Sequence, residues 1–332
     1  MRKNRRSLLV GILGTIIMFV LVLGSTQAFA DYPDRPVTIL VGFAPGGSMD
    51  LSARALARSA EKILGQPIII ENKTGGTGTV ALAALLSQNP DGYVLCATPS
   101  SVLIRVSQMQ QVPFKPFTSF KPIIGFSEPL LGIVVKNDST WKNMKDLVND
   151  ARKNPGKVKY ATTGVGSTTH AAVDEIAAAK KLQMIHIPYK GSVEALTALL
   201  GGHVDFASLT SELVSSVKSG QTRLLATMGK KRSPKFSDVP TLKEAGYDFV
   251  NDAVFSIVGP SNLPPDVAKK LETAFTQATK SQEYLEALDK IDMVPVNYSS
   301  KEFDNFLRIN WKKINKHLIA SGLIKEAATL PE

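Results

Sequence analysis

Two stretches of the chain share one pattern, in which a short apolar strand runs into a glycine-rich turn that opens a helix. The first covers residues 37–50 and contains the pair Gly46–Gly47, and the second covers residues 157–170 and contains Gly164 and Gly166. A helix N-terminus presents unpaired backbone N–H groups and a partial positive charge, so each turn is suited to hold an anion. Two such turns, far apart in the sequence, suggest two domains that hold one small anion between them.

Strand and helix patterns alternate along most of the chain, which favours an α/β fold whose parallel strands are covered by helices on both faces. Strands are expected at residues 37–41, 67–71, 93–97, 131–135, 158–162, 184–188, 204–207, 222–228 and 255–260. Helices are expected at 51–64, 80–87, 143–154, 168–181, 193–200, 213–219, from 264, at 282–291 and at 301–320. The proline-rich stretch 112–122 is predicted to be a surface loop, and Pro240 to start a short helix that ends at Gly246.

The N-terminus has the pattern of a secretory signal peptide. Four basic residues precede an apolar run over residues 8–23, and Ala28-Phe29-Ala30 provides a cleavage site of the A-x-A type. We therefore expect a signal peptide over residues 1–30, cleavage after Ala30 and export of the remaining chain. An uncleaved membrane anchor is the alternative, but the run is short for a span of about 20 residues.

Length and charge narrow the class of protein. A chain of 332 residues is long enough to form two domains. Its net charge of +10 includes four basic residues of the N-terminal segment, and no basic block with interleaved aromatic residues is present, so nucleic acid is not expected as a partner. The only cysteine, Cys96, lies in an apolar strand pattern and is expected to be a small buried side chain. Stability must come from core burial, because one cysteine cannot form an intramolecular disulfide.

The first turn combines backbone freedom with polar groups. Gly46 and Gly47 allow a sharp turn and close approach of the backbone to a ligand. Ser48 is the expected N-cap, and Asp50 falls in the first helical turn, where a carboxylate is favoured. The alternative is that the two glycines only connect a strand to a helix.

The second turn is richer in hydroxyl groups and is followed by His170 in the first turn of its helix. Hydroxyl groups and backbone N–H groups suit carboxylate oxygens and ordered water. A dinucleotide site is disfavoured, because the third glycine of that fingerprint is absent and no acidic residue closes the next strand. No nucleophile elbow, zinc-protease or C-x-x-C motif is present, and the four histidines show no metal-ligand spacing. We expect no metal and no cofactor.

Tyr189 lies where another strand ends and a helix begins, and we expect it at the same sheet edge as the second turn. Its aromatic face and hydroxyl group could both meet a ligand. The alternative is a core aromatic residue with a solvated tip.

Eight ordered motifs make the chain resemble the periplasmic substrate-binding proteins of tripartite tricarboxylate transporters, the Bug or TctC-like family. They are YPxRPV at 32–37, FAPGGSxD at 43–50, LGQPI at 64–68 with ENK at 71–73, PDGY at 90–93, GxGSxxH at 164–170, PYKG at 188–191, LGGxVD at 200–205 and VPTxxEAG at 239–246. The resemblance covers essentially the whole chain after residue 30.

The resemblance implies a two-lobed α/β periplasmic-binding-protein fold of the Venus-flytrap type II, with a ligand cleft between the lobes. The first lobe would comprise residues 31–130 and 253–332, and the second residues 131–252. The implied function is capture of a small carboxylate and its delivery to the membrane permease subunits of a tripartite tricarboxylate transporter, by a periplasmic monomer without enzymatic activity. The candidate ligand-binding residues are Phe43, Gly46, Gly47, Ser48, Asp50, Thr162, Thr163, Gly166, Ser167, Thr168, His170, Tyr189 and Asp205.

The chain departs from the family pattern at Val165, where members often carry a polar residue, commonly Asn. The loss of that side-chain hydrogen bond puts the usual substrates in doubt and makes Val165 a candidate for ligand preference. Two other functions stay open: a sensor that presents its bound acid to a membrane receptor, and an enzyme on the same scaffold with His170 as a base.

Overall fold

The computed structural model describes residues 32–250, 253–320 and 322–325. The predicted signal peptide and its cleavage site therefore lie outside the described residues. The main compact unit begins at Arg35, and the short piece before it contains a cis peptide bond between Tyr32 and Pro33. No helix within the described ranges is both long and apolar enough to cross a bilayer.

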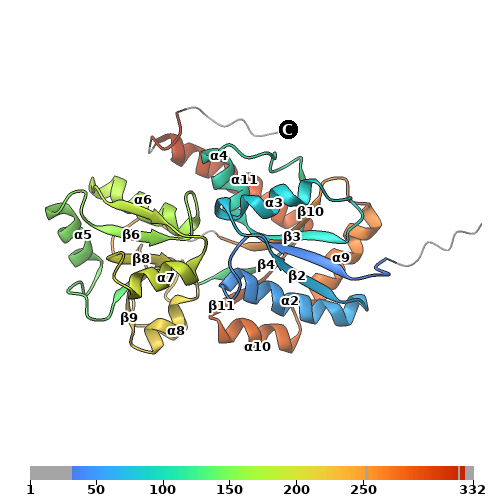
Figure 1. Cartoon of the computed structure of the whole chain (residues 1–332), viewed down its shortest axis with the longest axis horizontal. Coiled ribbons are helices and arrows are strands. Elements are labelled where there is room, and N and C mark those ends of the chain that lie inside the picture. The colour runs from blue at the N-terminus through green and yellow to red at the C-terminus, as the bar shows by residue number, and fades with distance from the viewer. Residues whose placement is uncertain (1–31, 251–252, 321, 326–332) are drawn as a thin grey trace, which may run out of the picture. The chain divides into compact units, whose positions relative to one another are not determined.

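The strands form two separate sheets. The first has six strands in the order β11-β4-β10-β3-β1-β2 (Figure 1). Its strands are β1 (Val37–Val41), β2 (Ile68–Asn72), β3 (Val94–Pro99), β4 (Phe120–Pro129), β10 (Phe255–Pro260) and β11 (Met293–Ser299). The second has five strands in the order β7-β6-β8-β5-β9. Its strands are β5 (Gly132–Lys136), β6 (Lys159–Thr162), β7 (Ile185–Pro188), β8 (Phe206–Leu209) and β9 (Thr222–Thr227).

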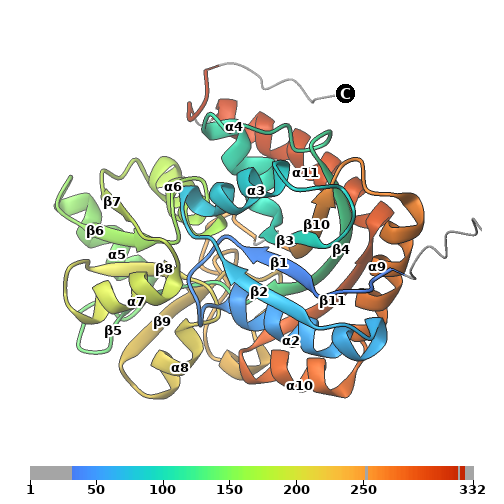
Figure 2. The ribbon, with the colours of Figure 1, turned by 45° about the vertical axis from the view of Figure 1, so that its right-hand side comes forward.

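Helices cover both faces of the six-stranded sheet (Figures 1 and 2). Helices α2 (Ser48–Leu64), α9 (Pro265–Ala278) and α10 (Gln282–Lys290) pack together, and α3 (Thr79–Leu86) and α11 (Ser300–Ala320) pack elsewhere on the sheet. Side chains of α3 and α11 share one core with Leu40 of β1 and Cys96 of β3. Cys96 is fully buried, as predicted, and burial raises the pKa of its thiol.

The five-stranded sheet is covered in the same way. Helices α5 (Met144–Lys153) and α6 (Thr168–Lys180) share a core with the buried side chains of Tyr160 and Phe206. Helices α7 (Ser192–Leu200) and α8 (Leu213–Lys218) share a second core with Val134 and Ala207. Adjacent residues of β8, Phe206 and Ala207, thus face opposite cores, as the two-residue period of a strand requires.

The chain passes from the six-stranded to the five-stranded sheet between Pro129 and Gly132, and it returns with Phe255. The predicted parallel arrangement does not hold at these crossings: β10 runs antiparallel to β3 and β4, and β5 runs antiparallel to β8 and β9. Strands β3 and β4 run toward the other sheet, whereas β10 carries the chain back from it. The lobe boundaries at residues 130 and 252 stay a prediction.

Several elements differ from the sequence prediction. Strand β4 begins at Phe120, inside the predicted loop, and β11 fills a segment for which no strand was expected. A π-helical turn, η2 (Val102–Val106), leads into the short helix α4 (Ser107–Met109). The helix predicted from Pro240 to Gly246 is absent: this segment forms turns, and the Leu242 N–H donates to the carbonyl of Thr227 in β9. This bond holds the segment in a non-helical path.

A bulge in β4 is stabilised from outside the sheet. The pairing of β4 with β10 skips Phe126, and the pairing with β11 skips it as well, so its carbonyl lacks a ladder partner. The hydroxyl of Tyr284, a fully buried side chain of α10, donates to that carbonyl at 2.8 Å. A buried polar group left unpaired is costly. Tyr284 therefore allows this central strand to bulge.

We predict that Tyr284→Phe lowers the free energy of unfolding by about 1–3 kcal/mol, because the buried Phe126 carbonyl loses its donor while the ring still fills the core. Urea denaturation monitored by circular dichroism measures the effect. Tyr298→Phe, at a partly exposed position of β11, serves as the matched control. Equal stability of the Tyr284→Phe variant and the parent would show that the bulge does not depend on this bond.

Candidate functional site

A cavity of about 50 Å³ lies where the carboxyl ends of strands from both sheets meet. Pro99 ends β3 and Pro129 ends β4, while Thr163 follows β6 and Thr210 follows β8; all four line the cavity. The volume is several times the roughly 10–15 Å³ that holds one water molecule, so the cavity has room for a small solute. This is the edge at which ligands bind in open α/β sheets.

Three helix N-termini point their first residues at this cavity: α2 with Ser48, α6 with Thr168 and α7 with Ser192. The first N–H groups of each helix have no partner within the helix, and each helix adds a partial positive charge. The remaining wall is largely apolar, formed by Phe43, Met49, Pro99, Pro129, Leu131 and Phe255. The cavity therefore suits a small molecule with an anionic end and an apolar body.

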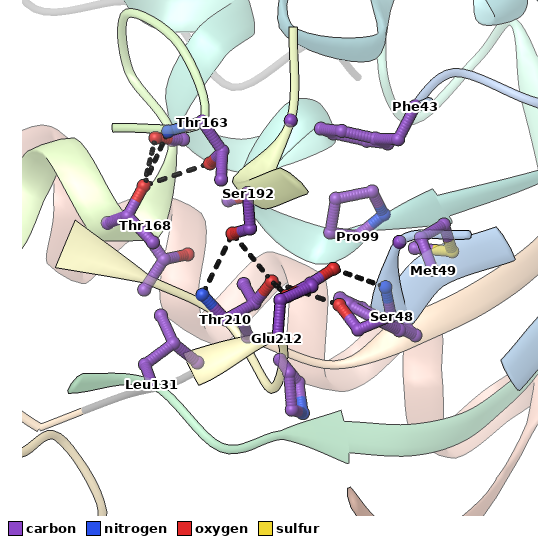
Figure 3. Close-up of a pocket in the computed structure, with 18 of the residues that line it drawn as sticks. Phe43, Ser48, Met49, Pro99, Leu131, Thr163, Thr168, Ser192, Thr210 and Glu212 are labelled. Carbon is purple, nitrogen blue, oxygen red and sulfur yellow. Dashed lines mark hydrogen bonds between the residues drawn. The ribbon is translucent and has the colours of Figure 1, made fainter. Parts of the chain in front are cut away.

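The first turn is shaped by Gly46 and Gly47. Gly46 has a φ of +78°, which favours glycine, and the helix N-cap is Gly47 rather than the predicted Ser48. Ser48 is the first helical residue, and its backbone N–H donates to Glu212 Oε1, a carboxylate from the loop after β8 (Figure 3). Glycine offers no capping side chain. Glu212, from the other sheet, therefore caps α2 in its place.

Thr210 connects the polar groups around this carboxylate (Figure 3). Its hydroxyl donates to Glu212 Oε2, and it lies 3.0 Å from Ser48 Oγ and 2.9 Å from Ser192 Oγ. The Thr210 backbone N–H also donates to Ser192 Oγ at 2.9 Å. Residues from three loops thus form one hydrogen-bonded network at the cavity wall.

Asp50 lies next to the cavity and does not line it. Its side chain is 2% exposed, and it accepts hydrogen bonds from the Gly46 N–H at 2.9 Å, the Asn72 amide at 2.9 Å and Arg54 Nε at 3.0 Å. Burial acts to raise the pKa of Asp50, but the bonds from Arg54, Gly46 and Asn72 outweigh it and hold the pKa below its usual value. Asp50 therefore holds the glycine turn in shape.

Of the second turn, the predicted residues Thr163, Ser167 and Thr168 line the cavity, and Thr169 lines it as well. Ser167 caps α6 by accepting the His170 N–H at 3.2 Å. Thr169 Oγ1 accepts the Thr163 N–H at 3.1 Å. Thr168 is 6% exposed, and no hydrogen-bond partner reaches its Oγ1 among the described residues. An unsatisfied buried hydroxyl is uncommon in folded proteins, so Thr168 is a group that a ligand could satisfy.

Thr162 and His170 lie behind this turn and do not line the cavity. Thr162 Oγ1 lies 2.7 Å from His186 Nε2, and His170 stacks on His186 with ring centres 4.0 Å apart. His170 Nδ1 accepts the Gly166 N–H at 3.1 Å, as a neutral imidazole can. Burial, with His186 and Arg105 nearby, lowers the pKa of His170 to about 3, and burial lowers that of His186 to about 4. These residues support the second turn from inside.

The other candidates are not brought into the cavity. Gly46 and Gly166 shape their turns with φ values of +78° and +79°. Tyr189 packs against the core shared by α7 and α8. Asp205 is exposed and accepts the Lys159 N–H at 2.7 Å at the start of β6, the opposite end of the strands from the cavity.

Val165 also lies outside the cavity lining. Its carbonyl accepts hydrogen bonds from Thr77 Oγ1 at 3.2 Å and Gln110 Nε2 at 3.0 Å, two residues attached to the six-stranded sheet. Gly164 allows this approach, since a Cβ there would lie 2.4 Å from Thr77 Oγ1. Val165 therefore joins the two sheets through its backbone, whatever its side chain.

Sequence reasoning missed Ser192, Thr210 and Glu212. Each follows a strand predicted from the sequence, 184–188 or 204–207, at its carboxyl end. The rule that ligands gather at this edge pointed to the segment 188–192, from which Tyr189 was selected instead of Ser192, and the segment 208–212 has no glycine to mark it. Among the described residues no cluster of three metal-ligating side chains occurs.

Two α/β sheets, with a small cavity where the carboxyl ends of their strands meet, are the architecture of periplasmic solute-binding proteins. A profile of the TctC family, the tripartite tricarboxylate transporter family receptor, matches residues 52–323, so the chain belongs to this family.

Relatives and solved structures agree with this assignment. The chain is 38% identical over 300 residues to the "UPF0065 protein in gbd 5'region" of Cupriavidus necator, covering 90% of this chain and 91% of that one. It resembles the structure of the periplasmic binding protein BugD with a TM-score of 0.84 and 27% identity, covering 88% and 99%. It also resembles R. palustris Rpa4515 with adipate, with a TM-score of 0.83 and 25% identity, again covering 88% and 99%. The predicted Bug or TctC-like family and the two-lobed fold are confirmed.

The histidine pair makes stability depend on pH. The folded pKa values of His170 and His186, about 3 and 4, lie below the usual 6.5, so their contribution to stability is present above pH 6.5 and is lost as the pH falls toward these values. Asp174, whose pKa burial raises to about 6, acts in the opposite sense. Its contribution is full below its usual pKa of 3.8 and is lost as the pH rises through 6.

We predict that the melting temperature falls as the pH is lowered from 7 to 4, because two histidines with lowered pKa values outweigh one carboxyl group. His186→Gln should flatten this slope, since one of the two histidines is then absent. His203→Gln, at an exposed position, is the control and should leave the slope as it is. Scanning calorimetry in matched buffers gives the slopes, and parallel curves for the parent and His186→Gln would contradict the assignment.

We also predict that Thr210→Val lowers the free energy of unfolding by about 1–3 kcal/mol, because Glu212 loses a donor and two serine hydroxyls lose an acceptor. Denaturant titration measures the change. Thr273→Val on the exposed surface of α9 is the control for replacing a helical or loop hydroxyl by a methyl group. An unchanged free energy of unfolding for Thr210→Val would mean that water replaces the network without loss.

Proposed function

We propose that this protein captures a small carboxylate in the cavity at the shared edge of its two sheets and delivers it to the membrane subunits of a tripartite tricarboxylate transporter. The observation that carries the proposal is the convergence of three helix N-termini on a cavity whose remaining wall is largely apolar. Helix N-termini favour anions, and two sheets around one solute strengthen each charge-assisted bond by excluding water.

The family supports the transport part of the proposal, since its members are the receptors of such transporters. Rpa4515, whose structure contains adipate, supports a carboxylate as the ligand. The basic and apolar N-terminal segment supports a periplasmic location, and we propose that the protein works there as a monomer. The alternative of an enzyme required His170 as a base, but His170 lies outside the cavity lining and its pKa is lowered to about 3.

The residues that would contact the acid lie at the N-terminus of α6 and in the neighbouring loops. We assign contact with the carboxylate to Ser167 and Thr168 of the second turn and packing against the rest of the acid to Phe43 of the first. Gly47 and Ser48 lie beside Glu212, which takes the Ser48 N–H. All five line the cavity. Asp50, Thr162, Gly166 and His170 would act indirectly, by holding these turns in place.

A thermal-shift and calorimetric screen of residues 31–332 against mono-, di- and tricarboxylates tests the proposal. An acid at a hundred times its dissociation constant should stabilise the protein by about 2.7 kcal/mol. Neutral analogues such as the corresponding amides should give no shift. A flat response across all acids would refute carboxylate binding.

Thr168→Val gives a sharper test of the site. Because Thr168 Oγ1 has no partner among the described residues, the methyl group should leave the ligand-free protein equally stable or more stable. Affinity for the acid should fall about tenfold, the equivalent of about 1.4 kcal/mol for one hydrogen bond. The matched control is Thr227→Val, another buried threonine without a partner in the described part of the chain, which does not line the cavity. Equal affinities for both variants would remove Thr168 from the site.

A further inference from the structure

Among the described residues that line the cavity, Glu212 is the only one with a formal charge. The other polar lining residues are serines and threonines, and the rest are apolar residues or glycines. A carboxylate in the wall of a site for an anion is unfavourable unless its charge is stabilised by hydrogen bonds within the protein. The contacts of Glu212 show which groups stabilise it.

The Glu212 carboxylate occupies the anion position at the N-terminus of α2. One oxygen accepts the Ser48 N–H, the other accepts the Thr210 hydroxyl, and a Cβ at Gly47 would lie 3.1 Å from Oε1 (Figure 3). These are the contacts that a ligand carboxylate would make with the first glycine turn. The chain thus fills one of its own anion positions.

The position at the N-terminus of α6 is different. Thr168 lines the cavity there with its buried, unpartnered hydroxyl, beside the Ser167 cap. No side-chain carboxylate of the described residues caps α6, because its cap is the Ser167 hydroxyl. The α7 N-terminus has no side-chain cap, but its Ser192 hydroxyl belongs to the Thr210 network that Glu212 holds. Of the three helix N-termini at the cavity, that of α2 is therefore filled by Glu212, and that of α6 offers the unpartnered Thr168 hydroxyl to a ligand.

We propose that Glu212 determines specificity by restricting the ligand to a single carboxylate. This inference rests on the proposed function. A monocarboxylate places its charged end at α6 and its apolar body against the wall that contains Phe43, Pro99 and Leu131. A second carboxylate, on the far end of a dicarboxylate, would meet the charge of Glu212 and be repelled.

The test compares acids of equal length with one and two carboxylates: butyrate with succinate, and hexanoate with adipate. Isothermal titration calorimetry is carried out on the parent chain, on Glu212→Gln and on Glu212→Ala. In the parent, we expect the monocarboxylate of a pair to bind at least tenfold more tightly. Glu212→Ala empties the α2 position and should shift the ratio toward the dicarboxylate by at least tenfold. Glu212→Gln removes the charge and keeps the size, so its shift should have the same sign and be smaller.

Glu286→Gln, an exposed residue of α10, is the control for loss of one negative charge and should keep the parent ratio. A parent that binds both acids of a pair equally, or prefers the dicarboxylate, would overturn the inference while leaving the proposed function intact. So would an unchanged ratio in both Glu212 variants, with circular dichroism showing that they are folded. Failure of every acid to bind any of the proteins would refute the proposed function itself, and this inference with it.

Discussion

Both sheets of this protein turn the carboxyl ends of their parallel strands to the same cavity, and the rest of the site depends on this constraint. A helix that follows a parallel strand begins at that edge, so α2, α6 and α7 all present their N-termini there. The cores lie on the faces of the sheets, away from this edge. Loops can therefore change the chemistry of the cavity without disturbing the packing that stabilises the fold.

The titratable side chains of the two glycine turns point into the protein and bind the turns themselves. Asp50 binds the Gly46 N–H, Asn72 and Arg54, and His170 accepts the Gly166 N–H. Both side chains are buried and hold the backbone of a turn. Backbone N–H groups and hydroxyls are left to face the cavity. These groups can bind an anion without a competing charge of their own, whereas a lysine or arginine would need a counterion when the cavity is empty.

Much of the fold could be predicted from local pattern, and the failures have physical causes. The β1–α2 and β6–α6 units have clear apolar runs followed by glycine, and both were found. Strand β11 contains Pro295, which argues against a strand, but β11 is an edge strand and its pairing is irregular after Pro295. Strand β4 contains Pro122 and depends on Tyr284 for its bulge, a contact over long range that no local pattern contains.

The site, like the fold, was predictable only where a local sequence pattern marks it. Sequence pointed to Ser167 and Thr168, which line the cavity, because they belong to the glycine turn that marked the candidate site. It selected Asp50 and His170 as ligand residues because residue type does not reveal whether a side chain points to a cavity or into the protein. Asp205 was chosen from the family motif, and it lies at the other end of its strand. Glu212 follows a predicted strand, but its own loop does not reveal its role as the cap of α2, since its partner Ser48 is 164 positions away.

The Thr210 hydroxyl has one proton and three oxygen neighbours, and this fixes a direction in the network. A carboxylate only accepts, so the proton goes to Glu212, and the hydroxyls of Ser48 and Ser192 must both donate to Thr210. The hydroxyl rotors of Ser48, Ser192 and Thr210 are thereby each held in one orientation. The negative charge of one residue sets the order of protons across three loops, and this part of the cavity wall presents a single polarity pattern before any solute arrives. A neutral side chain at position 212 would leave that order undetermined, with several rotor arrangements of similar energy.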